Sequence, residues 1–211
     1  MNSIVQKLRG VALAALAATA FLSQVEAAPV VFLAPASSTT TVGGHALVDI
    51  MVSGLDTSTP EPVGGFSLTL GFNNTLVTGF GFVNDPDAKM GALPLDLSLG
   101  FSGGSLDLFF VADVTETQAS LSASEGASFR LASLDFLGAV NGVSPLTLSN
   151  VVLSNWTGTA TLDGVTARNG EICVADRGQT CQALPVPEPA SLLLVAAALG
   201  ALTMGRRRQA V

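Results

Sequence analysis

Tyrosine is absent from this chain of 211 residues, tryptophan and histidine occur once each, and there are only two cysteines. One histidine and two cysteines cannot complete a tetrahedral zinc site without help from carboxylates, so zinc chemistry is nearly excluded. The nine Lys and Arg residues are outnumbered by sixteen Asp and Glu residues. The resulting net charge of -7 repels phosphate and argues against nucleic acid as a partner.

Charged residues of either sign are scarce as well. They make up 12% of the chain, compared with roughly 25% in an average soluble domain. Hydrophobic residues reach 48%, which argues against intrinsic disorder. Part of the chain is therefore expected to lie outside water.

The N-terminus has the layout of a secretory signal peptide. Lys7 and Arg9 supply the positive charge, and an apolar run follows them. Small residues then predict cleavage between Ala27 and Ala28. An uncleaved membrane anchor is the alternative, but the run is short for about 30 Å of hydrocarbon.

The C-terminus carries a second targeting signal, which consists of three consecutive parts. These are Val186-Pro187-Glu188-Pro189, an apolar segment at residues 190–205, and a tail at residues 206–211 that contains Arg206, Arg207 and Arg208. The apolar segment predicts a short transmembrane helix, and the arginines place its end in the cytoplasm by the positive-inside rule. The two prolines resist helix formation, so the peptide outside the membrane stays extended and accessible to a processing enzyme.

These three parts, in this order, resemble the PEP-CTERM sorting signal. The resemblance implies a Gram-negative host and export by the Sec machinery. It also implies an exosortase, which cuts at or near the Pro-Glu-Pro motif, and an extracellular polysaccharide as a candidate partner. The Gram-positive signal of similar layout requires Leu-Pro-x-Thr-Gly, which does not occur here.

The middle of the chain predicts one all-β domain, a single antiparallel β-sandwich. Apolar residues alternate with polar ones, as expected for strands with one buried face. The alternating runs are 46–53, 66–72, 106–110 and 156–163, and turn residues separate them. Leu131, Leu134 and Phe136 break the alternation, which predicts either a bulge or a strand buried on both faces. No long helical period is present.

Two pairs of segments resemble cohesin domains. Residues 48–55 end in Gly-Leu, and residues 65–73 read Gly-Phe and end in Phe-Asn; residues 129–136 and 146–153 resemble a later strand pair. The resemblance covers about residues 40–165 and implies a jelly-roll sandwich of the kind that carbohydrate-binding modules share. Asn73-Asn74 stands where cohesins usually have Asp-Pro, a departure that argues against recognition of a dockerin.

The expected organisation has four parts: a signal peptide at 1–27, the cohesin-like sandwich at 28–165, a linker at 166–185 and the sorting signal at 186–211. Cys173 and Cys181 are the only cysteines, and their even number in an exported segment predicts a disulfide in the linker. A free thiol pair or a redox centre is the alternative, without a Cys-x-x-Cys motif to support it.

Few residues of the middle domain suggest chemistry. Asp85 and Asp87 are weak candidates for calcium ligands, since Asp residues are also common turn formers. Residues 100–104 match Gly-x-Ser-x-Gly, but a predicted strand follows where a hydrolase has a helix. Among the phenylalanines, Phe80, Phe82 and Phe101 lie off the core-like positions and are the candidates for sugar contacts.

The sequence thus predicts an exported, non-enzymatic surface or matrix protein that needs no cofactor. A carbohydrate-binding or adhesion module is the first alternative. A secreted hydrolase is the second, and it lacks a complete motif.

Overall fold

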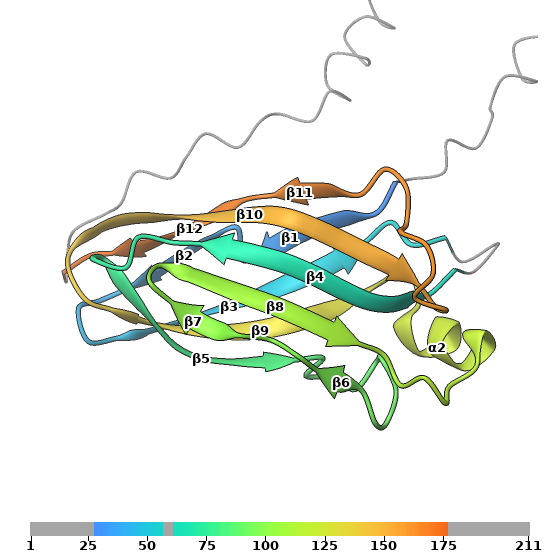
Figure 1. Ribbon diagram of the computed structural model, residues 1–211. Coiled ribbons are helices and arrows are strands. Elements are labelled where there is room, and N and C mark those ends of the chain that lie inside the picture. Colours follow the sequence, from blue (N-terminus) through green and yellow to red (C-terminus); the bar gives the residue numbers. More distant parts are fainter. Residues whose placement is uncertain (1–27, 57–60, 177–211) are drawn as a thin grey trace, which may run out of the picture. The chain divides into compact units, whose positions relative to one another are not determined.

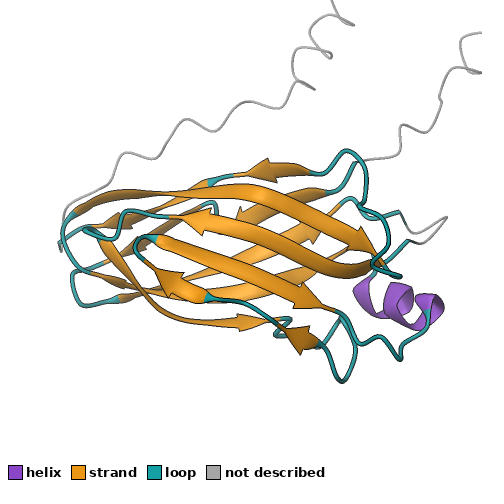
Figure 2. Cartoon of the chain, viewed as in Figure 1, coloured by secondary structure: helices purple, strands orange, loops and turns teal. Residues whose placement is uncertain are grey.

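The computed structural model describes residues 28–56 and 61–176. They belong to the first of two compact units, Met1–Cys181 and Gln182–Val211. The described residues form two facing β-sheets and one short helix (Figure 1, Figure 2). The predicted signal peptide, transmembrane segment and sorting motif lie outside the described residues.

One sheet has five strands, in the order β11 (Thr166–Arg168), β1 (Val30–Ala34), β3 (His45–Ser53), β9 (Ser128–Gly138) and β5 (Val77–Asn84). The other has seven: β2 (Ser37–Thr40), β12 (Gly170–Val174), β10 (Gly142–Asn155), β4 (Val63–Gly71), β8 (Ser105–Val111) and β6 (Leu95–Asp96), with β7 (Gly100–Ser102) also paired to β8. Most pairings are antiparallel, and the predicted all-β sandwich is confirmed.

Alternation along the strands decides which side chains enter the core. In β3 the even-numbered residues from Ala46 to Val52 are buried, and Leu106, Leu108 and Phe110 are buried in β8. Because side chains alternate between the faces of a strand, each sheet turns one apolar face toward the other. The core therefore lies between the sheets, as the period-two pattern predicts.

The first two strands of the sandwich lie in different sheets, and so do the last two. β1 pairs with β3 and β11 in the five-stranded sheet, whereas β2, two residues further on, pairs with β12 in the seven-stranded sheet. β11 and β12 make the same change around Asn169, alongside the first pair. A side chain on Gly170 would collide with the Ala36 carbonyl oxygen at 2.6 Å, so glycine allows this close approach.

Three features differ from or refine the sequence predictions. Residues 166–174, predicted as part of a linker, form β11 and β12 inside the two sheets, so the sandwich extends beyond residue 165. Residues 156–163, predicted as a strand, form a turn-rich loop because the Asn155 side chain accepts hydrogen bonds from Thr159 N and Ala160 N. The irregularity predicted around residue 131 is a bulge, since Arg130 and Ala132 pair with adjacent residues of β3.

The helix α2 (Gln118–Glu125) was not predicted. Its signal is short: Thr117 caps the N-terminus by accepting a hydrogen bond from Ser120 N at 3.2 Å, and Gly126 ends it with a positive φ of 63°. Eight residues are too few to show a helical hydrophobic period. The helix lies at the end of the sandwich where β4 begins (Figure 1).

Candidate functional site

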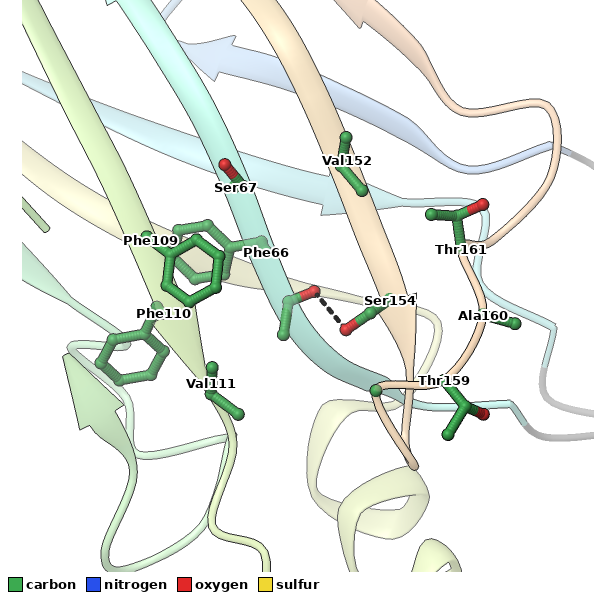
Figure 3. Close-up of a pocket in the computed structure, with 12 residues that line it drawn as sticks. Phe66, Ser67, Phe109, Phe110, Val111, Val152, Ser154, Thr159, Ala160 and Thr161 are labelled. Atoms are coloured by element: carbon green, nitrogen blue, oxygen red, sulfur yellow. Dashed lines mark hydrogen bonds between the residues drawn. The ribbon is translucent and has the colours of Figure 1, made fainter. Parts of the chain in front are cut away.

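The outer face of the seven-stranded sheet carries an apolar groove of about 400 Å³. Ser67 of β4 lies between Phe109 of β8 and Val152 of β10 in one row across the sheet. Thr159 and Thr161 of the following loop close the groove on one side (Figure 3). Because Ser67 is small, a hollow remains at its position, and the apolar side chains of Phe109 and Val152 flank this hollow.

Backbone geometry keeps this groove open. Gly65 lies in the next row, between Val111 and Ser154, and the Ser154 hydroxyl donates to the Gly65 carbonyl at 3.3 Å (Figure 3). A Cβ at Gly65 would approach the Phe110 carbonyl oxygen to 2.9 Å. Glycine is therefore required by close packing of the neighbouring strand, and the groove floor is bare backbone.

Exposed leucines extend the apolar surface beside the groove. Leu95 lies opposite Val111 in the β6–β8 pair, and Leu97 and Leu99 donate backbone hydrogen bonds to β8 at 2.9 and 3.0 Å. All three side chains are more than half exposed. Contiguous exposed apolar surface of this kind marks binding sites more often than single exposed residues do.

Sequence analysis missed this surface, although its signal is visible. Phe109 falls on the same side of β8 as Asp107, the side that alternation assigns to solvent. It is 45% exposed. A large aromatic residue at a solvent position and leucines at every second position from 93 to 99 are the features that point to it.

The outer face of the five-stranded sheet is held by ion pairs instead. Arg130 donates to Asp87 at 2.7 and 3.2 Å and to Asp49 at 3.2 Å. These hydrogen bonds from Arg130 hold the pKa of Asp87 below its usual range. The Ser133 hydroxyl donates to the second Asp49 oxygen, so that carboxylate is also engaged.

The weak calcium candidates serve other roles in the structure. Asp85 is buried, and its two oxygens accept hydrogen bonds from Lys89 N at 2.7 Å and Met90 N at 2.8 Å. Asp87 is bound by Arg130, as described above. Within residues 28–56 and 61–176, no group of three or more His, Cys, Asp or Glu side chains is placed to hold a metal ion.

Within the part of the chain that the structure describes, the buried carboxyl group of Glu125 forms no ion pair. Glu125, at the end of α2, is 3% exposed and accepts a hydrogen bond from Val63 N at 2.8 Å, while its Oε1 atom has no hydrogen-bond partner among residues 28–56 and 61–176. Burial, reinforced by the negative charge of Asp85, raises the pKa of Glu125 to about 8. Glu125 is the last residue of α2, and it is not one of the residues that line the groove.

The three phenylalanines considered for sugar contacts differ in their exposure to solvent. Phe101 packs edge-on against Phe72, Phe82 and Phe136 at centroid distances of 5.8, 6.0 and 5.5 Å. Phe82 and Phe101 are thus part of the aromatic packing at the edge of the core. Phe80 alone is exposed, on the outer face of the five-stranded sheet.

The remaining sequence candidates have structural roles or lie outside the described residues. Residues 100–104 form a hairpin between β7 and β8, with Gly103 and Gly104 at positive φ, so no strand-to-helix turn presents Ser102. Cys173 is buried in β12, whereas Cys181 lies outside the described residues, so their bond stays a prediction. No helix in the described part of the chain is long and apolar enough to cross a membrane.

Comparison with known proteins identifies one family model, the PEP-CTERM protein-sorting motif, which matches residues 185–209. No curated protein matches the chain.

Solved structures similar to this one include several cohesins. A non-cellulosomal cohesin from Archaeoglobus fulgidus is 15% identical, with a TM-score of 0.53, 72% of this chain and 94% of that chain covered. The seventh ScaB type I cohesin from Pseudobacteroides cellulosolvens is 17% identical, with a TM-score of 0.52, covering 74% and 98%. The third cohesin of ScaC from Acetivibrio cellulolyticus, solved in complex with a dockerin, is 16% identical, with a TM-score of 0.52, covering 70% and 99%.

At these identities the likeness concerns the fold. It agrees with the sandwich topology and with the sequence resemblance over residues 40–165. The motif match implies exosortase-targeted export with membrane-anchored sorting. The chain therefore carries a PEP-CTERM sorting motif behind a β-sandwich with the cohesin fold.

Proposed function

We propose that this protein is an exported, non-enzymatic binding module of the cell surface or extracellular matrix. The observation that carries the proposal is the sorting motif at residues 185–209. In this proposal the Sec machinery exports the chain, cleavage after Ala27 frees the N-terminus, and residues 190–205 hold the protein in the inner membrane. An exosortase then recognises Val186 to Pro189 and releases the sandwich, which associates with extracellular polysaccharide.

The groove on the seven-stranded sheet is the proposed binding surface for a protein partner. Its lining is mostly apolar, with Phe109 and Val152 on either side of a bare floor. Aromatic side chains in partly enclosed pockets supply much of the affinity at protein interfaces. The cohesin fold of the sandwich supports a binding role, and one cohesin of similar fold was solved with a dockerin.

The sorting proposal is tested by replacing Pro187, Glu188 and Pro189 with alanine. Alanines remove the stiffness of the outer flank and let the membrane helix continue outward, so the extended cleavage substrate is lost. We expect the variant to stay full length in the inner-membrane fraction of a host with an exosortase, while the unaltered protein is trimmed and released.

The chain supplies a matched control, because Pro60-Glu61-Pro62 repeats the tripeptide without an apolar run or arginines behind it. Pro60→Ala with Glu61→Ala, which leaves the buried Pro62 in place, should be trimmed and released normally. Equal release of the triple-alanine variant and the unaltered protein would contradict the sorting proposal.

A further inference from the structure

We propose that the outer face of the five-stranded sheet binds a neutral polysaccharide through Phe80, His45 and Asp135. The inference rests on the proposed association with extracellular polysaccharide and names the residues that make the contact. It concerns the face of the sandwich opposite to the groove, so the two surfaces can be tested separately.

The first step is the position of Phe80. The pairing of β5 with β9 shifts between Gly79 and Gly81, so Phe80 lies at a bulge. Its side chain is 66% exposed. A Cβ at Gly79 would collide with the ring of Phe101 at 2.2 Å, so the strand is held at this point by packing from inside. The bulge therefore presents an aromatic ring to solvent on a fixed backbone.

The second step is the polar pair beside the ring. His45 meets Phe80 edge-on, with centroids 4.8 Å apart and planes at 89°. Its Nδ1 atom lies 2.9 and 3.0 Å from the two oxygens of Asp135. An ionised carboxylate only accepts hydrogen bonds, so Nδ1 carries the hydrogen in this contact. The pair fixes the imidazole ring against Phe80 and leaves Nε2 and the remaining carboxylate lone pairs for a ligand.

The third step is the open surface next to this pair. Gly81 lies opposite Asp135, and a Cβ placed on Gly81 would meet no atom within 4 Å. Leu47 and Val83, which are 69% and 57% exposed, lie on the same outer face. The result is a shallow surface with an exposed ring, a bare strip of backbone and hydrogen-bond acceptors at one edge.

Such a surface fits a sugar ring. The C–H groups on one side of a pyranose are slightly positive and suit the negative face of an aromatic ring, while its hydroxyl groups donate to a carboxylate or an imidazole nitrogen. Ligand sites generally combine an apolar surface with a few placed polar groups. A purely apolar partner would bury Asp135 and His45 without hydrogen bonds to replace water, which is costly.

Charge selects a neutral polysaccharide. Residues 28–185 contain fourteen acidic and four basic side chains, so the exported domain is strongly negative. Anionic polysaccharides would be repelled by this field. Both oxygens of Asp135 already contact His45, so the carboxylate does not require a cationic ligand. Its remaining lone pairs can accept hydrogen bonds from the neutral hydroxyl groups of a sugar.

The test uses the purified full chain in mild detergent and affinity electrophoresis through gels that contain dextran, mannan or galactan. At least one of these neutral polysaccharides should retard the protein. Phe80→Ala should weaken that binding about tenfold, the loss expected for one aromatic contact. Trp156→Ala, which removes another exposed aromatic side chain, should leave binding unchanged, and thermal unfolding should show that both variants are folded.

Several results would overturn the inference. If Phe80→Ala binds as well as the unaltered chain, or if Trp156→Ala loses as much, the site is not at Phe80 although polysaccharide association stands. If none of the three neutral polysaccharides retards the protein, the inference of a neutral polysaccharide site falls, whereas normal trimming and release would leave the sorting proposal standing. If the protein instead binds oligolysine, and that binding disappears in about 0.5 M NaCl, the face is a cation-binding surface and the inference falls. Release from the membrane, which depends on the sorting motif alone, should be normal in every one of these variants.

Discussion

The two outer faces of the sandwich differ although the inner faces follow the same rule. In both sheets, alternate residues are apolar and buried in a shared core. On the outside, the seven-stranded sheet presents Phe109, Val152 and bare backbone, whereas the five-stranded sheet presents the Arg130 ion pairs and Phe80. The core therefore determines the fold, and the solvent positions of the same strands determine what each face can bind.

Glycines show the same contrast at the level of the backbone. Gly64, at the start of β4, lies so close to the end of β10 that a Cβ would meet the Asn155 carbonyl oxygen at 2.1 Å and Trp156 Cα at 2.6 Å. Gly81, in β5 of the other sheet, has open space at its Cβ position. The first glycine is needed for packing, and the second leaves a surface free.

The largest effect is expected from Gly64→Ala. The added methyl group collides with backbone atoms, which cannot rotate away, so β4 and β10 must separate where they pair. We expect a loss of roughly 3 kcal/mol or more in the free energy of unfolding, or failure to fold. Urea unfolding of the purified chain measures it.

Gly81→Ala is the matched control on the other face. Its φ is not positive and nothing obstructs the methyl group, so stability should be unchanged or higher by about 0.5 kcal/mol through the lower entropy of the unfolded chain. Equal stability of both alanine variants would show that the contrast between the two glycines is wrong.

A smaller effect is expected from Glu125→Gln, and it depends on pH. The pKa of Glu125 is raised to about 8 by burial, so the folded protein keeps this proton while the unfolded chain releases it above about pH 4.5. Stability should therefore fall as the pH rises between these values and level off above pH 8. Between pH 5 and pH 7 the loss is about 3 kcal/mol, since each pH unit between the two pKa values corresponds to about 1.4 kcal/mol.

Glutamine cannot ionise but can still accept the hydrogen bond from Val63 N, so the variant should lack this decline. Thermal unfolding at pH 5 and pH 9 compares the two proteins. Parallel losses in both would place the titrating group elsewhere. The test bears on the comparison of the two outer faces, because the hydrogen bond from Val63 N to Glu125 joins α2 to the start of β4, the strand beneath the groove.

Sequence patterns predicted much of the interior and little of the surfaces. Period-two alternation identified the buried side of β3, β4 and β8, because hydrophobic burial is periodic along a strand. It failed for residues 156–163, where the Asn155 side chain caps a loop through bonds that alternation does not register. It also missed α2, which is too short to show a period.

The surfaces depend on which strands become neighbours. His45 and Asp135 are 90 residues apart in sequence, and Ser67, Phe109 and Val152 come from three strands. No local pattern records these pairings. The sorting motif is the opposite case, because its parts are consecutive in sequence and can be recognised without a fold.

The smallest effect is expected from Arg130→Met, which removes the ion pairs of the five-stranded face and keeps most of the side-chain volume. Arg130 bridges Asp49 and Asp87, and all three side chains are about one third exposed or more, so solvent screening limits the gain. We expect a loss of about 1 kcal/mol at neutral pH and low salt. Because Arg130 lowers the pKa of Asp87, this contribution is present above the ordinary Asp pKa and disappears as the pH falls through the lowered value. Unfolding of the two proteins at pH 7 and pH 2 should show the difference shrinking with acid, and salt should reduce it as well.

Arg168→Met, on an exposed residue of β11, is the matched control and should leave stability unchanged. A difference that persists in acid and at high salt would mean that Arg130 acts through the packing of its apolar stem, and the face would then resemble the groove face more closely than its ion pairs indicate.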